Sequence, residues 1–72
     1  MLATFVLNRM QIKPLYDYFI DRIIRFERTD EYHYTTILRF NTKASLEQAV
    51  RVIYGNHPHC RPKVTIMNTN LQ

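Results

Sequence analysis

Residues 44–56, with the sequence ASLEQAVRVIYGN, contain the signals for both ends of a short helix. Ser45 followed by Gln48 matches a capping box, and Gly55, the only glycine in the chain, stands where a helix ends. The apolar residues between these signals recur on one helical face: Leu46, Ala49, Val50 and Ile53. Because strand-like patterns lie on both sides of this helix, the chain is predicted to form a small α/β or α+β domain.

The length and the cysteine content limit the architecture and the compartment. A chain of 72 residues has room for one domain with a thin core, so we treat residues 1–72 as a single unit. Cys60 is the only cysteine, which excludes an internal disulfide and favours a reducing compartment. Residues 1–7 are apolar but too few for a signal sequence or a membrane span. We therefore expect a soluble, cytoplasmic protein that does not bind a membrane.

The net charge favours an anionic partner. Ten Lys and Arg residues against six Asp and Glu residues give a charge of +4, and the cations are spread along the chain together with five Tyr and four Phe residues. This combination is typical of surfaces that bind single-stranded nucleic acid, since cations neutralise phosphates and rings stack on bases. Solubility alone would also explain a charge of this size.

Local patterns predict most of the remaining elements. An apolar run over residues 3–8 predicts a first strand, and Pro14 suits the first position of a helix that reaches Asp21 or Arg22. The clearest strand pattern covers residues 32–40, and a last strand is predicted over residues 63–67.

The segment of residues 24–30 decides between two folds. Helical spacing can be extended through it, but Ile24, Phe26 and Arg28 also alternate with polar residues as in a strand, which we favour. The order of elements then predicts a ferredoxin-like α+β fold, βαββαβ, in which an antiparallel sheet carries two helices on one face. If the segment is helical instead, a three-stranded βαβαβ sheet with one long first helix results. In both folds one sheet face stays uncovered.

The chain resembles a divergent RNA-recognition-motif domain. Residues 4–8, TFVLN, resemble the first-strand signature of that family, and residues 37–40, ILRF, resemble the end of its third-strand signature. Residues 49–56 resemble its second helix and the turn after it. The resemblance implies RNA binding on the open sheet face, with Phe5 as the stacking residue. Thr35 and Ile37 stand where the family has aromatic residues, and its glycine near the start of the third strand is missing.

Strand alternation supplies the candidate binding residues. Phe5 either stacks a base on the open face or lies in the core, because it shares the more apolar side of its strand with Ala3 and Leu7. His33, Ile37 and Arg39 are expected on the open face of the sheet, which a basic rim surrounds. The full predicted set, for nucleic acid or a protein partner, is Phe5, Arg9, His33, Ile37, Arg39, Arg61 and Lys63.

No active site, metal site or cofactor is predicted. His57, His59 and Cys60 lie close together, but Pro58 separates the histidines and no second cluster of ligands completes a metal site. A single glycine excludes a glycine-rich phosphate loop, and no serine or cysteine has an identifiable base. We therefore expect a protein that is not an enzyme.

Two functions of a small, non-catalytic binding protein follow. The first is binding of single-stranded nucleic acid or RNA through the open sheet face and a basic rim of Arg9, Arg61 and Lys63. The alternative is a stand-alone regulator or inhibitor, for example one encoded by a virus or a mobile element. Such a protein would dock on an acidic protein partner or form a homodimer through the same face. The scarcity of aromatic residues expected on that face favours a protein interface, whereas the net charge favours nucleic acid.

Overall fold

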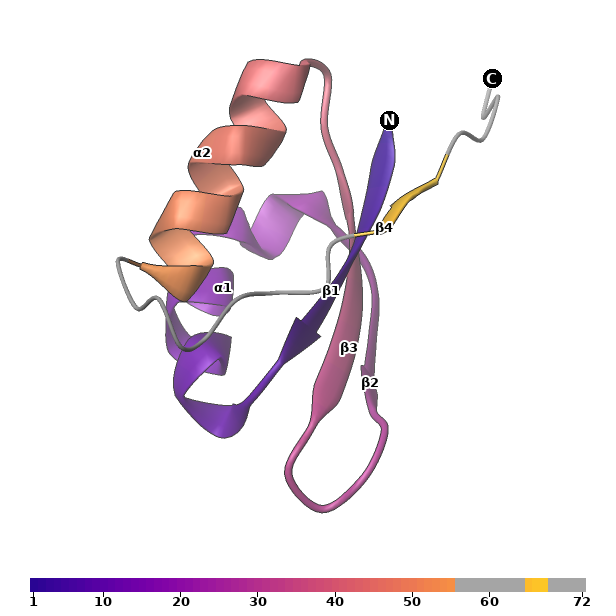
Figure 1. Cartoon of the computed structure of the whole chain (residues 1–72), viewed down its shortest axis with the longest axis vertical. Helices are drawn as coiled ribbons and strands as arrows, with labels where there is room; N and C mark the ends of the chain where they lie inside the picture. Colours follow the sequence, from indigo (N-terminus) through magenta and orange to yellow (C-terminus); the bar gives the residue numbers. More distant parts are fainter. Residues whose placement is uncertain (56–64, 68–72) are drawn as a thin grey trace.

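The computed structural model of the chain describes residues 1–55 and 65–67. A four-stranded antiparallel sheet carries two α-helices on one face (Figure 1). The elements are, in chain order, β1 (Leu2–Leu7), α1 (Ile12–Phe19), β2 (Ile23–Arg28), β3 (Tyr34–Arg39), α2 (Lys43–Tyr54) and β4 (Thr65–Met67). Two short 3-10 helices, η1 (Arg9–Gln11) and η2 (Ile20–Arg22), flank α1. None of the helices within residues 1–55 and 65–67 is both long enough and apolar enough to cross a membrane.

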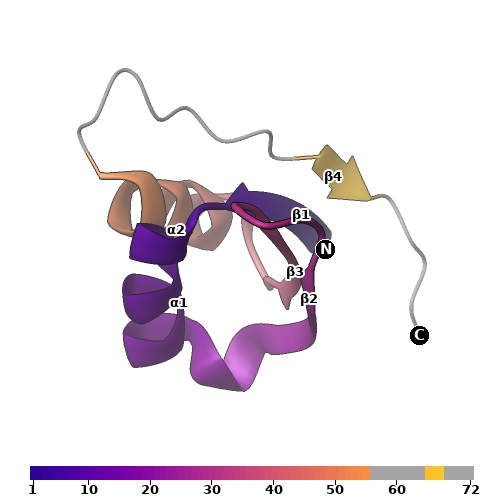
Figure 2. The same ribbon diagram turned by 90° about the horizontal axis from the view of Figure 1, so that it is seen from below.

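The strand order in the sheet is β2-β3-β1-β4, and each neighbouring pair is antiparallel (Figure 2). The central strand β1 pairs with β3 on one side and with β4 on the other. The predicted α+β class is confirmed, and the arrangement is compatible with the predicted βαββαβ fold. The three-stranded alternative is wrong, because residues 23–28 pair with β3 instead of extending the first helix.

The first helix differs from the prediction at both ends. A capping box starts η1: Gln11 N donates to Asn8 Oδ1 at 3.2 Å, and Asn8 N donates to Gln11 Oε1 at 2.8 Å. Pro14 is consequently the third residue of α1 and not its first. The α-helix ends at Phe19, and η2 leads the chain directly into β2.

Thr42, and not Ser45, caps the second helix. The Ser45 N–H donates to Thr42 Oγ1 at 3.1 Å, so α2 begins at Lys43 and the predicted capping box is wrong. The predicted end is confirmed: Gly55 has a φ of 60°, which glycine adopts without steric cost. The Gly55 N–H donates to the Arg51 carbonyl at 2.7 Å and satisfies one of the last carbonyls of the helix.

One apolar core fills the space between the sheet and the helices. The Phe5 ring stacks on Tyr54 with centroids 5.9 Å apart and lies 6.2 Å from the Phe40 ring. Other buried members of this core are Ala3, Leu7, Leu15, Leu38, Leu46, Ala49 and Ile53. The Tyr54 hydroxyl donates to the Val6 carbonyl at 2.8 Å, and burial raises the pKa of this phenol. Packing and a hydrogen bond thus both fix α2 to the central strand.

Candidate functional site

Phe5 lies on the helix side of β1 and is 0% exposed. Phe40 and Tyr54 pack against its ring, so Phe5 offers no surface on which a base could stack. The proposed placement of Phe5 on the open face is therefore wrong. The other possibility left open by the sequence, a core phenylalanine, is the one that the structure shows.

The open face of the sheet is aliphatic and rich in hydroxyl groups, with charges along its β2 side. Two of its rows of cross-strand neighbours are Arg25, Ile37, Thr4 and Thr65 in one, and Glu27, Thr35 and Val6 in the next; Arg39 lies beyond them, opposite Leu2. Neither row contains an aromatic side chain, so these rows lack the stacking platform of an RNA-recognition motif.

Ile37 and Arg39 lie on the open face, as strand alternation predicted. Ile37 is half-buried, and Arg39 is exposed at the end of β3. Arg22 Nη1 donates to the Arg39 carbonyl at 3.3 Å, and the Arg22 guanidinium lies 5.6 Å from the centre of the Phe40 ring. The backbone that carries Arg39 is thus held by a neighbouring cation, while the Arg39 side chain faces solvent.

His33 lies in the loop of the β2–β3 hairpin and not on the open face. Asp30 organises this loop, because Asp30 Oδ1 accepts hydrogen bonds from Tyr32 N at 2.7 Å and from His33 N at 2.8 Å. The same carboxylate lies 3.0 Å from His33 Nδ1. The hydrogen bond from the Tyr32 N–H, followed by that from the His33 ring, lowers the pKa of the Asp30 carboxyl. β3 therefore begins at Tyr34, and the prediction that His33 belongs to this strand is wrong.

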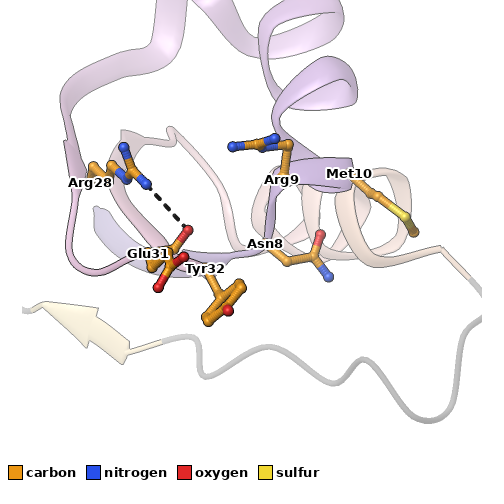
Figure 3. Close-up of a pocket in the computed structure, with 6 residues that line it drawn as sticks. All are labelled: Asn8, Arg9, Met10, Arg28, Glu31 and Tyr32. Atoms are coloured by element: carbon orange, nitrogen blue, oxygen red, sulfur yellow. Dashed lines mark hydrogen bonds between the residues drawn. The ribbon is translucent and has the colours of Figure 1, made fainter.

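The hairpin loop also forms one wall of a hollow at the end of the sheet, which we call the end hollow. It has a volume of about 560 Å³ and is lined by Asn8, Arg9, Met10, Arg28, Glu31 and Tyr32 (Figure 3). The residues after β1 supply its other wall. Tyr32 is 69% exposed and Met10 is exposed as well, so an apolar surface is open to a ligand beside the charged groups.

Two arginines reach the end hollow from different elements. Arg28 donates from Nε to the Asp30 carbonyl at 3.1 Å and from Nη2 to the Glu31 carbonyl at 3.4 Å, which fixes its guanidinium against the loop. Arg9 is the first residue of η1, between the two capping-box residues, and it forms no ion pair with another described residue. Figure 3 shows the Arg9 guanidinium directed toward the side of the hollow where Arg28 lies.

The end hollow combines the groups that bind an anion attached to a planar ring. Guanidinium groups donate paired hydrogen bonds to phosphate or carboxylate oxygens, and a phenol ring stacks on a base. Glu31 is the one acidic residue among the six that line the hollow, and it opposes anion binding. No group of three or more His, Cys, Asp or Glu residues in the described part of the chain could hold a metal ion.

Of the predicted residues that the structure describes, Arg9 alone lines the end hollow, and the sequence analysis missed Met10, Arg28 and Tyr32 as binding residues. Asp30 was the signal in the sequence that could have located this loop. An aspartate side chain often accepts hydrogen bonds from the backbone N–H groups two and three residues later, which predicts a tight loop between Arg28 and Tyr34. Arg61 and Lys63 of the predicted rim lie outside the described residues, as does the cluster of His57, His59 and Cys60.

Comparisons with known proteins identify no relative: no protein-family model matches the chain, and neither does any curated protein or solved structure. The geometry and the charge of the described residues are therefore the basis for assigning a function.

Proposed function

We propose that this protein is a small, non-catalytic domain that binds single-stranded nucleic acid at the end hollow and along the open sheet face. The observation that carries this proposal is the meeting of Arg9, Arg28 and the exposed Tyr32 ring around one hollow. Cations and a stacking ring are the two components that single-strand recognition requires.

The end hollow suits one nucleotide unit. Its volume of about 560 Å³ falls in the range of roughly 300–1,000 Å³ that small-ligand sites occupy. Arg28 is positioned by its two bonds to the loop backbone, so binding a phosphate costs little ordering of this side chain. Arg9 supplies the second cation, and Tyr32 offers its ring to the base.

The open sheet face extends the binding surface away from the hollow. Arg25 and Arg39 are exposed there, and both lie within reach of a backbone that crosses β3. Thr35 adds a hydroxyl group, which can bind phosphate or sugar without reading the base. Weak sequence preference is expected, because Tyr32 is the one aromatic residue among the six described residues that line the hollow.

The ferredoxin-like topology and the RNA-recognition-motif resemblance are part of this proposal. The antiparallel order β2-β3-β1-β4 and the position of both helices on one face support the topology. The ring and the cations at the end of the sheet would replace the central aromatic residues of that family. The reducing, cytoplasmic compartment expected from the single cysteine belongs to the same proposal.

Fluorescence polarisation with labelled single-stranded RNA and DNA, over a series of salt concentrations, tests this function. Each phosphate contact contributes about 0.7 to the slope of log affinity against log salt for single strands. Arg9→Ala and Arg28→Ala should each lower the slope by about this amount. Tyr32→Ala should weaken binding about 5- to 100-fold and leave the slope unchanged, because stacking releases no counterions.

Arg51→Ala is the matched control, since it removes an exposed arginine of α2 that does not line the hollow. Absence of salt-sensitive binding by the wild-type protein at low ionic strength would refute the proposal. Equal effects of Arg51→Ala and Arg28→Ala would show that net charge, and not the hollow, attracts the strand.

Binding of a protein partner is the second candidate function. The absence of aromatic side chains from the two described rows of the open face favours it. Val6, Thr35 and Ile37 form a half-buried aliphatic strip with Arg25 and Arg39 beside it, which suits an acidic protein with an apolar centre. Ile37→Glu separates the two candidates, because it should abolish docking on this strip and leave stacking on Tyr32 intact.

A further inference from the structure

The strand β2 forms one edge of the sheet and exposes one side of its backbone. β3 is its one strand partner in the described part of the chain, and β4 lies at the opposite edge (Figure 2). β2 has six residues, whereas β4 has three. An exposed edge of this length presents a row of N–H and C=O groups to which another strand can add.

The charges along this edge are self-complementary. Arg25 and Glu27 are two positions apart, so both side chains lie on the open face, with Arg25 Nε 2.9 Å from Glu27 Oε1. Their side chains are 65% and 53% exposed. When two copies of β2 pair antiparallel around Phe26, Arg25 of each copy lies opposite Glu27 of the other. Opposite residues have Cβ atoms about 4.5–5.5 Å apart, which is close enough for an ion pair on each side of the centre.

An aromatic contact lies on the other face of the same junction. The half-buried Phe26 ring stacks on Tyr34 at 5.6 Å and is edge-on to Tyr16 at 5.6 Å. In the symmetric pairing Phe26 lies opposite the same residue of the second copy, and each ring covers the remaining exposed part of the other. The bulge between Ile23 and Arg25 lies outside this regular part of the strand.

We propose that the β2 edge binds the β2 edge of a second copy of this chain and joins two four-stranded sheets into one of eight strands. Two copies are the favoured occupants because the Arg25 and Glu27 pattern is complementary to itself under a twofold axis, as an isologous interface requires. The junction is small for a stable dimer, so dimerisation depends on protein concentration.

Sedimentation velocity over a concentration series, with protein alone, tests this inference. Arg25→Glu places a glutamate opposite Glu27 of the other copy on each side of the centre, and Glu27→Arg creates the equivalent repulsion between arginines. Each single variant should raise the dimer dissociation constant about tenfold or more. An equimolar mixture of the two variants should dimerise like the wild type, because a copy with two glutamates then pairs with a copy with two arginines.

The chain carrying both Arg25→Glu and Glu27→Arg should also dimerise with itself, since the reversed pattern is again self-complementary. Arg39→Glu, at the far end of β3, is the control and should leave the dimer unchanged; circular dichroism checks that all variants are folded. A wild-type protein that stays monomeric at its highest soluble concentration overturns the inference. If the mixture of Arg25→Glu and Glu27→Arg proteins fails to associate, the proposed pairing register around Phe26 is wrong.

Discussion

Replacing Tyr54 by phenylalanine would remove one buried hydroxyl while its ring stays in the core. Tyr54 is 4% exposed, its ring stacks on Phe5, and its hydroxyl donates to the Val6 carbonyl at 2.8 Å. Loss of such a hydrogen bond costs about 1 kcal/mol in the free energy of unfolding. In a domain of this size a loss of about 1 kcal/mol lowers the melting temperature by roughly 4–8 °C.

The same substitution should also remove a loss of stability that the wild-type protein suffers at high pH. Burial raises the pKa of Tyr54 above its ordinary value, so the folded chain keeps the phenolic proton at a pH where the unfolded chain releases it. The stabilisation that this group contributes is fully present below pH about 10 and is lost as the pH rises further, by up to about 1.4 kcal/mol per pH unit. Tyr54→Phe lacks this loss, so its stability should equal that of the wild type near pH 11.

Urea unfolding followed by circular dichroism, at several pH values between 7 and about 11, measures both effects. Tyr18→Phe is the matched control, because Tyr18 is 69% exposed and the hydroxyl of that residue should contribute little. Parallel pH profiles for Tyr54→Phe and the wild type would refute the reasoning, since they would mean that the Tyr54 hydroxyl is not withdrawn from water in the folded chain.

Substitutions at three further positions test the core, a cap and the hollow. Phe5→Ala should lower the free energy of unfolding by about 3–5 kcal/mol in urea titrations, while Phe5→Leu should fold and bind oligonucleotides like the wild type. Loss of binding by a folded Phe5→Leu protein would contradict the core position. Thr42→Ala should destabilise by about 1 kcal/mol in thermal unfolding, and Thr42→Ser should not, because serine keeps the capping oxygen. Glu31→Gln should tighten oligonucleotide binding about two- to fivefold at low salt in polarisation titrations, because it removes the one acidic group from the hollow; unchanged affinity would place the strand elsewhere.

The sequence identified elements whose signal is local. Gly55 ends α2 as predicted because a left-handed conformation favours glycine, and the alternation in β2 correctly indicated a strand. The alternation of side chains along β3 correctly placed Ile37 and Arg39 on the open face, because this pattern is also local. The predicted start of the second helix was wrong because two caps compete: Ser45 has the better box pattern, but Thr42 lies at the point where the chain leaves β3. The predicted start of the first helix was wrong because the capping box of Asn8 and Gln11 begins helical structure before Pro14.

The candidate site was less predictable because it depends on contacts between distant segments. Arg28 and Arg9 are far apart in the sequence, and only the pairing of β2 with β3 and of β3 with β1 brings them to one end of the sheet. His33 was misplaced because strand alternation was continued into residues that Asp30 holds in a loop. Phe5 was ambiguous because an aromatic residue with aliphatic neighbours fits both a core and a stacking platform, and only the position of Tyr54 decides between them.

The two proposals of a binding hollow and a β2-edge dimer reinforce each other through the symmetry of the junction. Antiparallel pairing around Phe26 directs the two hairpins to opposite ends of the combined sheet, so the two end hollows lie far apart while the two open faces are continuous. A strand long enough to reach both hollows would bind with an avidity that exceeds a single site about 100-fold or more. By linkage, the same strand would favour the dimer over the monomer, whereas a short oligonucleotide confined to one hollow would not.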